Sequence, residues 1–300
     1  MQSFFDWLVK EGADHTVVLT IIGTIITALG SLIALFLKEF LLTRSFESWK
    51  EKKSAYLIYR KYRDPILLSA VELYQIVDQI TEHYPPGFLD SKHYYSPAKS
   101  IQQNSLSDAY FLKYKLISTT YRLCAFLGWL ELYREEITFL DSGKKQVNSS
   151  FDNALHNFKL ALADGRIMNK ACWDSWKDSL IFREEQRAIG ESMMVQKNSA
   201  QSIMGYAEFT KQLMNSGANI HSWLPILQAF LTNPQSDNDF RKIRLEFVML
   251  YLSQLIAVLD SKRVTVEMVR RIEEIKTDLR TAERNNVLQP GLIEKDRWES

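Results

Sequence analysis

The densest group of side chains that could do chemistry lies in one short stretch, FREEQRAIGE, which begins at Phe182. On a helix, Arg183 and Arg187 are four residues apart and share one face, where two guanidinium groups can clamp a phosphate or a carboxylate. The more ordinary alternative is a ladder of ion pairs, since Glu184 and Glu191 stand three and four residues from Arg187. The glutamates could also act as acid and base, but no further residue is placed to position them.

Arg122 and Arg134, in a long helical pattern earlier in the chain, complete the set of candidate residues for binding an anionic ligand. The five histidines pair neither with one another nor with a cysteine at metal-ligand spacing. The chain contains no GxSxG, P-loop or GxGxxG motif. We therefore predict no catalytic residue, no metal site and no cofactor, and we expect a protein that is not an enzyme.

The composition is that of a globular protein with a substantial core, with 46% hydrophobic and 24% charged residues. The net charge of +1 argues against a general nucleic-acid binder, which would carry a strongly basic surface. Both cysteines, Cys124 and Cys172, lie in apolar or aromatic surroundings. We expect them to be buried free thiols in a reducing compartment.

The stretch Thr16–Leu37 carries no charged side chain. At ~1.5 Å per residue it is long enough to cross the ~30 Å hydrocarbon core of a bilayer. A cleaved signal peptide is a poorer explanation, because Asp6 and Glu11 precede the stretch and no small-residue cleavage site follows it. Lysine and arginine are concentrated between Lys38 and Arg63. The positive-inside rule then predicts an inner-membrane anchor with the N-terminus outside and the following domain in the cytoplasm.

Small and hydroxyl residues gather on one face of this predicted span, which we call the seam. Its members are Thr20, Gly23, Thr24, Thr27, Gly30 and Ser31. Helices associate in lipid through such faces, and the simplest partner is another copy of the chain. The seam favours either a dimerising anchor, whose hydroxyls bond to their own helix, or a ring of helices lining a narrow pore. A monomer facing lipid is the third alternative.

The rest of the chain predicts an all-α protein, a cytoplasmic multi-helix bundle behind a single N-terminal transmembrane helix. We expect an interfacial segment (1–15), the span (16–37), a helical connector (38–63), the cytoplasmic all-α domain (64–284) and a loose tail (285–300). Asp64 and Pro65 are suited to capping and starting a new helix. Further helical patterns cover 107–140, 150–163, 206–214, 223–231, 237–259 and 265–284, and another begins at Trp173. Gly128 marks either a close helix crossing or a kink, and no segment predicts a strand.

Four motifs resemble a family of uncharacterised microbial proteins that have an N-terminal span and a helical body. They are Tyr62-Arg63-Asp64-Pro65, Gly128-Trp129-x-Glu131, Glu185-Gln186-Arg187-Ala188-Ile189-Gly190-Glu191 and Gly205-Tyr206-Ala207-x-Phe209. The resemblance covers residues 50–215 and implies a layout rather than an activity. In that layout the chain is also similar to pore-forming membrane effectors of bacterial antiphage defence, such as the Hailong effector. This second resemblance implies a homo-oligomeric channel whose cytoplasmic helices bind a nucleotide or oligonucleotide signal.

Two functions follow as hypotheses. In the first, the protein is a homo-oligomeric membrane effector whose helical body senses an anionic signal and whose span opens or perturbs the bilayer. In the second, the span is only a tether, and the body is a scaffold for a cytoplasmic protein partner.

Overall fold

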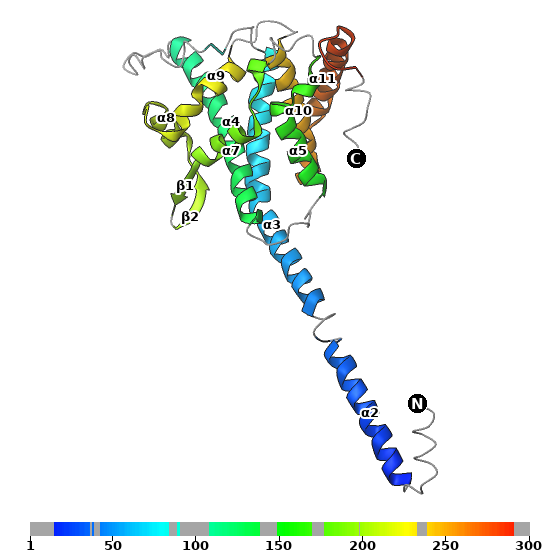
Figure 1. The fold of residues 1–300 in the computed structure, drawn as a ribbon. Helices are drawn as coiled ribbons and strands as arrows, with labels where there is room; N and C mark the ends of the chain where they lie inside the picture. Colours follow the sequence, from blue (N-terminus) through cyan, green and yellow to red (C-terminus); the bar gives the residue numbers. More distant parts are fainter. Residues whose placement is uncertain are drawn as a thin grey trace. The chain divides into compact units, whose positions relative to one another are not determined.

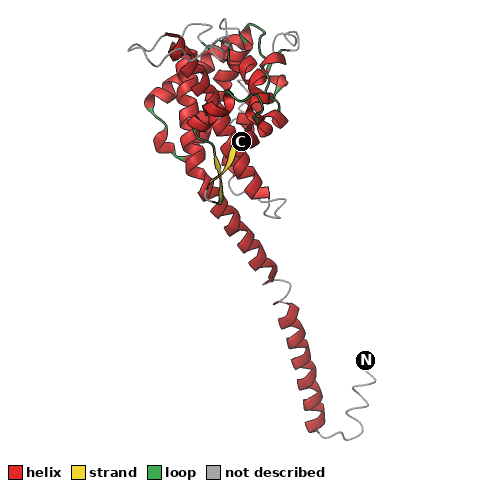
Figure 2. Cartoon of the chain, turned by 90° about the vertical axis from the view of Figure 1, so that its left-hand side faces the viewer, coloured by secondary structure: helices red, strands yellow, loops and turns green. Residues whose placement is uncertain are grey.

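The computed structural model describes residues 15–36, 38, 43–83, 89–90, 108–138, 149–169, 177–197, 199–232 and 239–290. The predicted interfacial segment and Cys172 lie outside these residues. The fold is all-α as predicted, with an apolar helix followed by a helical body (Figures 1 and 2). The chain divides into two compact units, Met1–Tyr56 and Leu57–Ser300. We describe each unit by itself and call residues 57–290 the body.

The apolar helix α2 spans His15–Phe36. Its portion Leu19–Phe36 is long and apolar enough to cross a membrane, and none of this portion is buried. The hydroxyls of Thr24, Thr27 and Ser31 each donate to the carbonyl oxygen four residues earlier, at 2.6–2.8 Å. These bonds satisfy the seam hydroxyls within the helix itself, so the hydroxyls do not depend on a partner for a hydrogen bond.

Helix α3 runs without a break from Thr43 to Asp78 and continues as a π-helical turn, Gln79–His83. The predicted restart at Pro65 is therefore wrong. A proline inside a helix costs ~3 kcal/mol through its missing N–H and its clash with the preceding turn. Tyr62 and Ile66, on either side of it, are both buried in the core. Packing of that face outweighs the local penalty.

Four long helices form the centre of the body (Figure 1). Besides α3 these are α4 (Asp108–Thr138), α5 (Ser149–Ala163) and α10 (Phe240–Leu259), and α11 (Val266–Arg284) packs beside them. Helix α10 is buried along most of its length and contacts both α5 and α11. The buried Cys124 on α4 is a free thiol, as predicted.

A group of shorter elements packs around the long helices of the body. They are α7 (Arg183–Ser192), β1 (Met194–Lys197), β2 (Ala200–Ile203), α8 (Tyr206–Leu213) and α9 (Leu224–Leu231), with 3-10 turns at Gly165–Ile167, Lys177–Ser179, Asn219–Trp223 and Ser261–Arg263. The antiparallel hairpin β1–β2, yellow in Figure 2, was not predicted. Its strands have four residues each, and their apolar residues do not alternate with polar ones, so they lack the pattern that identifies a strand. Ser199, with φ of 65°, makes the left-handed turn between them.

The segment predicted as a loose tail is held in place over its first residues. Asn286, with φ of 57°, turns the chain back after α11. Leu288 is completely buried and forms a β-bridge with Met168. The backbone N–H of Gln289 donates to the carbonyl oxygen of Ile167 at 3.1 Å. The prediction is therefore wrong for these residues, and residues 291–300 lie outside the described part.

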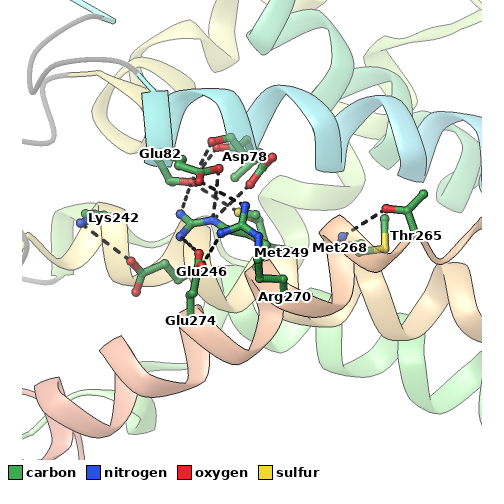
Figure 3. A network of polar contacts seen from close by, with 12 residues as sticks. Asp78, Glu82, Lys242, Glu246, Met249, Thr265, Met268, Arg270 and Glu274 are labelled. Atoms are coloured by element: carbon green, nitrogen blue, oxygen red, sulfur yellow. Dashed lines mark hydrogen bonds and ion pairs between the residues drawn. The ribbon is translucent and has the colours of Figure 1, made fainter.

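Charged side chains join the end of α3 to α11 (Figure 3). Arg271 of α11 is only 8% exposed, and its Nε lies 3.2 Å from Asp78 Oδ1 and 3.8 Å from Glu82 Oε2. Arg270 and Glu274 extend the same network along α11. Its cations and carboxylates lie against one another, so we assign this network to the stability of the body.

Candidate functional site: a basic pocket between three helices

A cavity of about 180 Å³ opens between α4, α5 and α7, and we call it the basic pocket. It is lined by Leu127, Leu130, Glu131, His156, Lys159, Arg183, Gln186 and Arg187. The lining thus combines two arginines, a lysine and a histidine with one carboxylate, one amide and an apolar floor of two leucines. Helix α7 packs against both α4 and α5.

One glycine, Gly190, lets α7 pack directly against α4. A Cβ at Gly190 would lie 2.8 Å from the carbonyl oxygen of Leu127 and 2.9 Å from Glu131 Cβ. A Cβ at Gly128 of α4 would lie 2.8 Å from Ile203 Cδ1. Gly128 therefore marks a close approach to the side chain of Ile203 on β2, and not the helix crossing considered from the sequence. Because no side chain separates the helices at Gly190, the preceding turn of α7 lies directly over α4.

The ion-pair ladder considered from the sequence is not formed in the described part of the chain. Neither Glu184 nor Glu191 makes an ion pair with Arg187 there. The side chain of Glu185 caps the N-terminus of α7, since its Oε2 accepts a hydrogen bond from the backbone N–H of Phe182 at 2.7 Å. The guanidinium groups of Arg183 and Arg187 are consequently not neutralised by the glutamates of their own helix.

Lys159 of α5 adds a half-buried cation to the pocket. Its ammonium group has no hydrogen-bond or ion-pair partner among the described residues. Burial lowers its pKa from the usual 10.5, and the charges of Arg187, Arg134 and Arg183 lower it further, against the opposing effect of Glu131. An ammonium group in such surroundings is stabilised by any anion that enters the pocket.

His156, one turn before Lys159 on α5, has a pKa below the usual 6.5. Burial is the main cause, and the positive charges of Arg183 and Lys159 add to it. The imidazole is thus mostly neutral at neutral pH, although an anion in the pocket would favour its protonated form.

The carboxylate of Glu131 is already paired. Its side chain is only 3% exposed, and its Oε1 accepts hydrogen bonds from Arg134 Nε, at 2.7 Å, and from Arg134 Nη2. The hydrogen bond to Glu131 is the main cause that raises the pKa of Arg134. These two charges cancel, so the pocket keeps the positive charge of its other cations.

Gln186 is 4% exposed, and its orientation is determined by two backbone acceptors. Its Nε2 donates to the carbonyl oxygens of Lys159, at 3.1 Å, and Ile181, at 2.8 Å. The amide oxygen Oε1 is buried and has no hydrogen-bond partner. Buried polar atoms without a partner are uncommon.

The structure brings together only part of the set predicted from the sequence. Arg183 and Arg187 line the pocket, and Arg134 contacts it through Glu131. Arg122 does not line it; its charge acts on Tyr206, whose pKa burial raises to about 12. Sequence reasoning did not single out Lys159, His156, Glu131 and Gln186 as pocket residues, because only the packing of three helices brings them to one place.

Comparison of the chain with protein-family models, with curated proteins and with solved structures finds no match. The resemblances described from the motifs and the layout therefore stay predictions. Within the described residues no group of three or more His, Cys, Asp or Glu side chains could hold a metal ion. What the arrangement of the pocket can do chemically is bind an anion through charge and hydrogen bonds.

Proposed function

We propose that this chain is a membrane-anchored effector whose helical body binds a small anionic ligand in the basic pocket. The observation that carries the proposal is the gathering of Lys159, Arg183 and Arg187 around one cavity. Among the residues that the structure describes, only one carboxylate lines the same cavity, and Arg134 already pairs with it. Holding a half-buried ammonium group without a counter-ion costs free energy, and a bound anion would offset that cost.

The anchor in this proposal is α2. Its apolar surface is entirely unburied, as expected for a helix that lies in lipid. The basic residues that follow it favour the cytoplasmic side of the inner membrane for the body, with the N-terminus outside. The basic pocket would then meet ligands of the cytoplasm.

In this proposal the membrane span produces the effect on the bilayer. Copies of α2 associate through the seam into a homo-oligomer, and ligand binding in the body changes that assembly so that the bilayer is opened or perturbed. Support comes from the small-residue face of the helix, since small residues let two helices approach closely in lipid.

A membrane-tethered scaffold for a cytoplasmic protein is the second candidate. The observation that favours it is a group of aromatic side chains at the start of α4: Tyr110, Phe111 and Tyr114 are 41–44% exposed. Exposed aromatic groups are typical of protein-binding surfaces. Replacing α2 by an unrelated span separates the two candidates, because a scaffold keeps its function after the exchange and an effector that acts through the seam loses it.

Ligand binding is tested by calorimetric titration of the full-length protein in detergent with inorganic phosphate. The variant carrying Arg183→Gln and Arg187→Gln should bind at least about tenfold more weakly, because a hydrogen bond to a charged group contributes ~1.5–3 kcal/mol. Arg122→Gln is the matched control, since Arg122 does not line the pocket, and it should leave the affinity unchanged. Equal affinities for the double variant and the wild type would refute the proposal, as would the absence of any binding.

A further inference from the structure

The basic pocket contains a nucleophilic group, the amine of Lys159 on α5. The side chain is half-buried, and its nitrogen forms no hydrogen bond or ion pair with the described residues. Among those residues, the fully buried side-chain atoms that lack a partner belong to Ser69, Tyr74, Tyr133, Gln186 and Gln228. Lys159 Nζ is not one of these atoms, so it keeps accessible surface on a side chain that lines the pocket.

A larger share of this amine is neutral at neutral pH than of an ordinary lysine side chain. Burial lowers the pKa of Lys159, and the charges of Arg187, Arg134 and Arg183 lower it further. Glu131 opposes this shift without cancelling it. Only the neutral amine has a free electron pair with which to attack a carbonyl carbon, and lysines beside other cations act as nucleophiles in this way.

The rest of the lining favours an electrophile that carries a phosphate group. Arg183 and Arg187 are exposed, lie one turn apart on α7 and line the same cavity as the amine. Guanidinium groups bind phosphate oxygens through paired hydrogen bonds. Leu127 and Leu130 add apolar surface, which suits a short carbon chain. A cavity of about 180 Å³ holds roughly six waters at ~30 Å³ each, so a phosphate with an acetyl group attached has room in it.

Resting on the proposed function, we infer that Lys159 is a modification site, acylated by small acyl phosphates of which acetyl phosphate is the simplest. The amine attacks the carbonyl carbon, so that a C–N bond forms and the C–O bond to the phosphate group breaks. Phosphate leaves with the electron pair of the broken bond and takes up the proton that the nitrogen loses. Arg183 and Arg187 hold the phosphate group while the carbonyl carbon meets the amine.

Acylation would change the pocket from which it results. The product is a neutral amide in place of a half-buried cation, so one of the charges gathered around the cavity is lost. We expect the acetylated protein to bind inorganic phosphate about tenfold more weakly, as for the loss of one hydrogen bond to a charged group. The modification therefore lowers the sensitivity of the body to its anionic ligand.

The test treats the full-length protein in detergent with acetyl phosphate and measures the acetylation rate of each lysine by mass spectrometry. Lys211 of α8 is the internal reference, because it is exposed and its ammonium group makes no ion pair with the described residues. Lys159 should react at least about tenfold faster than Lys211, since the bound phosphate group holds the carbonyl carbon near the amine.

Acetic anhydride, which carries no phosphate group, separates recognition from the reactivity of the amine. At Lys159 the rate with acetyl phosphate is divided by the rate with acetic anhydride. A change in the pKa of the amine alters both rates alike and leaves this ratio unchanged. The variant carrying Arg183→Gln and Arg187→Gln should lower the ratio about tenfold. Arg122→Gln is the matched control and should leave it unchanged.

Equal rates at Lys159 and Lys211, in protein that binds inorganic phosphate, would overturn this inference and leave the proposed anion site standing. An unchanged ratio in the double variant would overturn it as well. Should the double variant not fold, the comparison of the two lysines in the wild type decides by itself. A failure of the proposed function is seen separately, as the absence of phosphate binding before any acetyl phosphate is added.

Discussion

Gly190 of α7 lies against the backbone of α4 so closely that a Cβ at this position would come within 2.8 Å of the carbonyl oxygen of Leu127. The neighbour is main chain, which cannot move aside as the end of a side chain can. This contact sets the position of the preceding turn of α7, and that turn carries Gln186 and Arg187 of the basic pocket. The geometry of the site therefore depends on the absence of a side chain at one residue.

Gly190→Ala should damage both the fold and the site. The added methyl group must push α7 away from α4, and such overpacking costs ~1–3 kcal/mol. We expect a lower denaturation midpoint together with weaker binding of inorganic phosphate, measured on the same preparation.

Gly205→Ala is the matched control, because no atom lies within 4 Å of a Cβ at Gly205. It should change neither property by a measurable amount. Identical stability and affinity for Gly190→Ala and the control would show that the two helices are not held by this contact.

Much of this fold could be predicted from local patterns, and little of the site could. The helix at 206–214 was placed within one residue of α8, because an apolar face and flanking glycines mark its ends. The shared face of Arg183 and Arg187 follows from helix geometry alone. Lys159 had no distinguishing signal, since its role depends on which helices pack around it. The prediction of a helix start at Pro65 failed for the same reason. The burial of Tyr62 and Ile66 in the core outweighs the tendency of proline to interrupt a helix.

Lys159→Met should make the body more stable and weaken the binding of phosphate. The substitution removes a half-buried charge that has no counter-ion among the described residues and keeps the length of the side chain. We expect the melting temperature to rise by about 2–4 °C, which for a domain of this size corresponds to ~1 kcal/mol. Phosphate affinity should fall at the same time. A variant that is both less stable and unchanged in affinity would contradict the role given to Lys159.

Binding should strengthen as the pH falls, through His156. Its pKa is lowered in the free protein by burial, then by Arg183 and Lys159, and a bound anion favours the charged imidazolium. Binding therefore takes up a proton, so affinity rises as the pH falls through the pKa of the bound state and levels off below the lower pKa of the free protein. Sulfate is the suitable probe, since it does not titrate between pH 5.5 and 8.

A rise in sulfate affinity of roughly five- to tenfold is expected over that range, equivalent to up to about one pKa unit. The groups that share the pocket with His156 are Arg183, Arg187, Lys159 and Glu131. The variant His156→Gln keeps all four and should lose most of the dependence. If the sulfate affinity of this variant depends on pH as strongly as that of the wild type, the titrating group is not His156.

Arg244 should be important for the stability of the body. It is completely buried, and it donates to Ser179 Oγ and Ala161 O, both at 2.9 Å, and to Asp164 O at 3.2 Å. Two of these acceptors lie at the end of α5, where a cation is favourable. Arg244→Met removes these three hydrogen bonds and should cost ~3 kcal/mol in the free energy of unfolding. The exposed Arg280 provides the control: Arg280→Met should cost less than ~0.5 kcal/mol.

The seam is tested by Gly23→Leu and Gly30→Leu. Neither leucine meets another atom of the chain within 4 Å at its Cβ, so both variants should express normally. In a homo-oligomer they would separate the helices and lower the mass measured by light scattering in detergent. Ile25→Phe enlarges a residue on the opposite side of α2 and should leave the mass unchanged. A wild type that is monomeric under these conditions would exclude a pore built from the seam.

Hydrogen–deuterium exchange of the full-length protein in detergent, with and without saturating inorganic phosphate, tests most directly whether the basic pocket is the ligand site. A ligand present at about 100 times its dissociation constant stabilises the bound state by ~2.7 kcal/mol, which slows local opening around the site about a hundredfold. We predict slower exchange in peptides that contain residues 154–162 of α5 and 182–192 of α7, and unchanged exchange in α11. Protection confined to other helices, or no protection at a phosphate concentration that saturates binding, would contradict the assignment of the site.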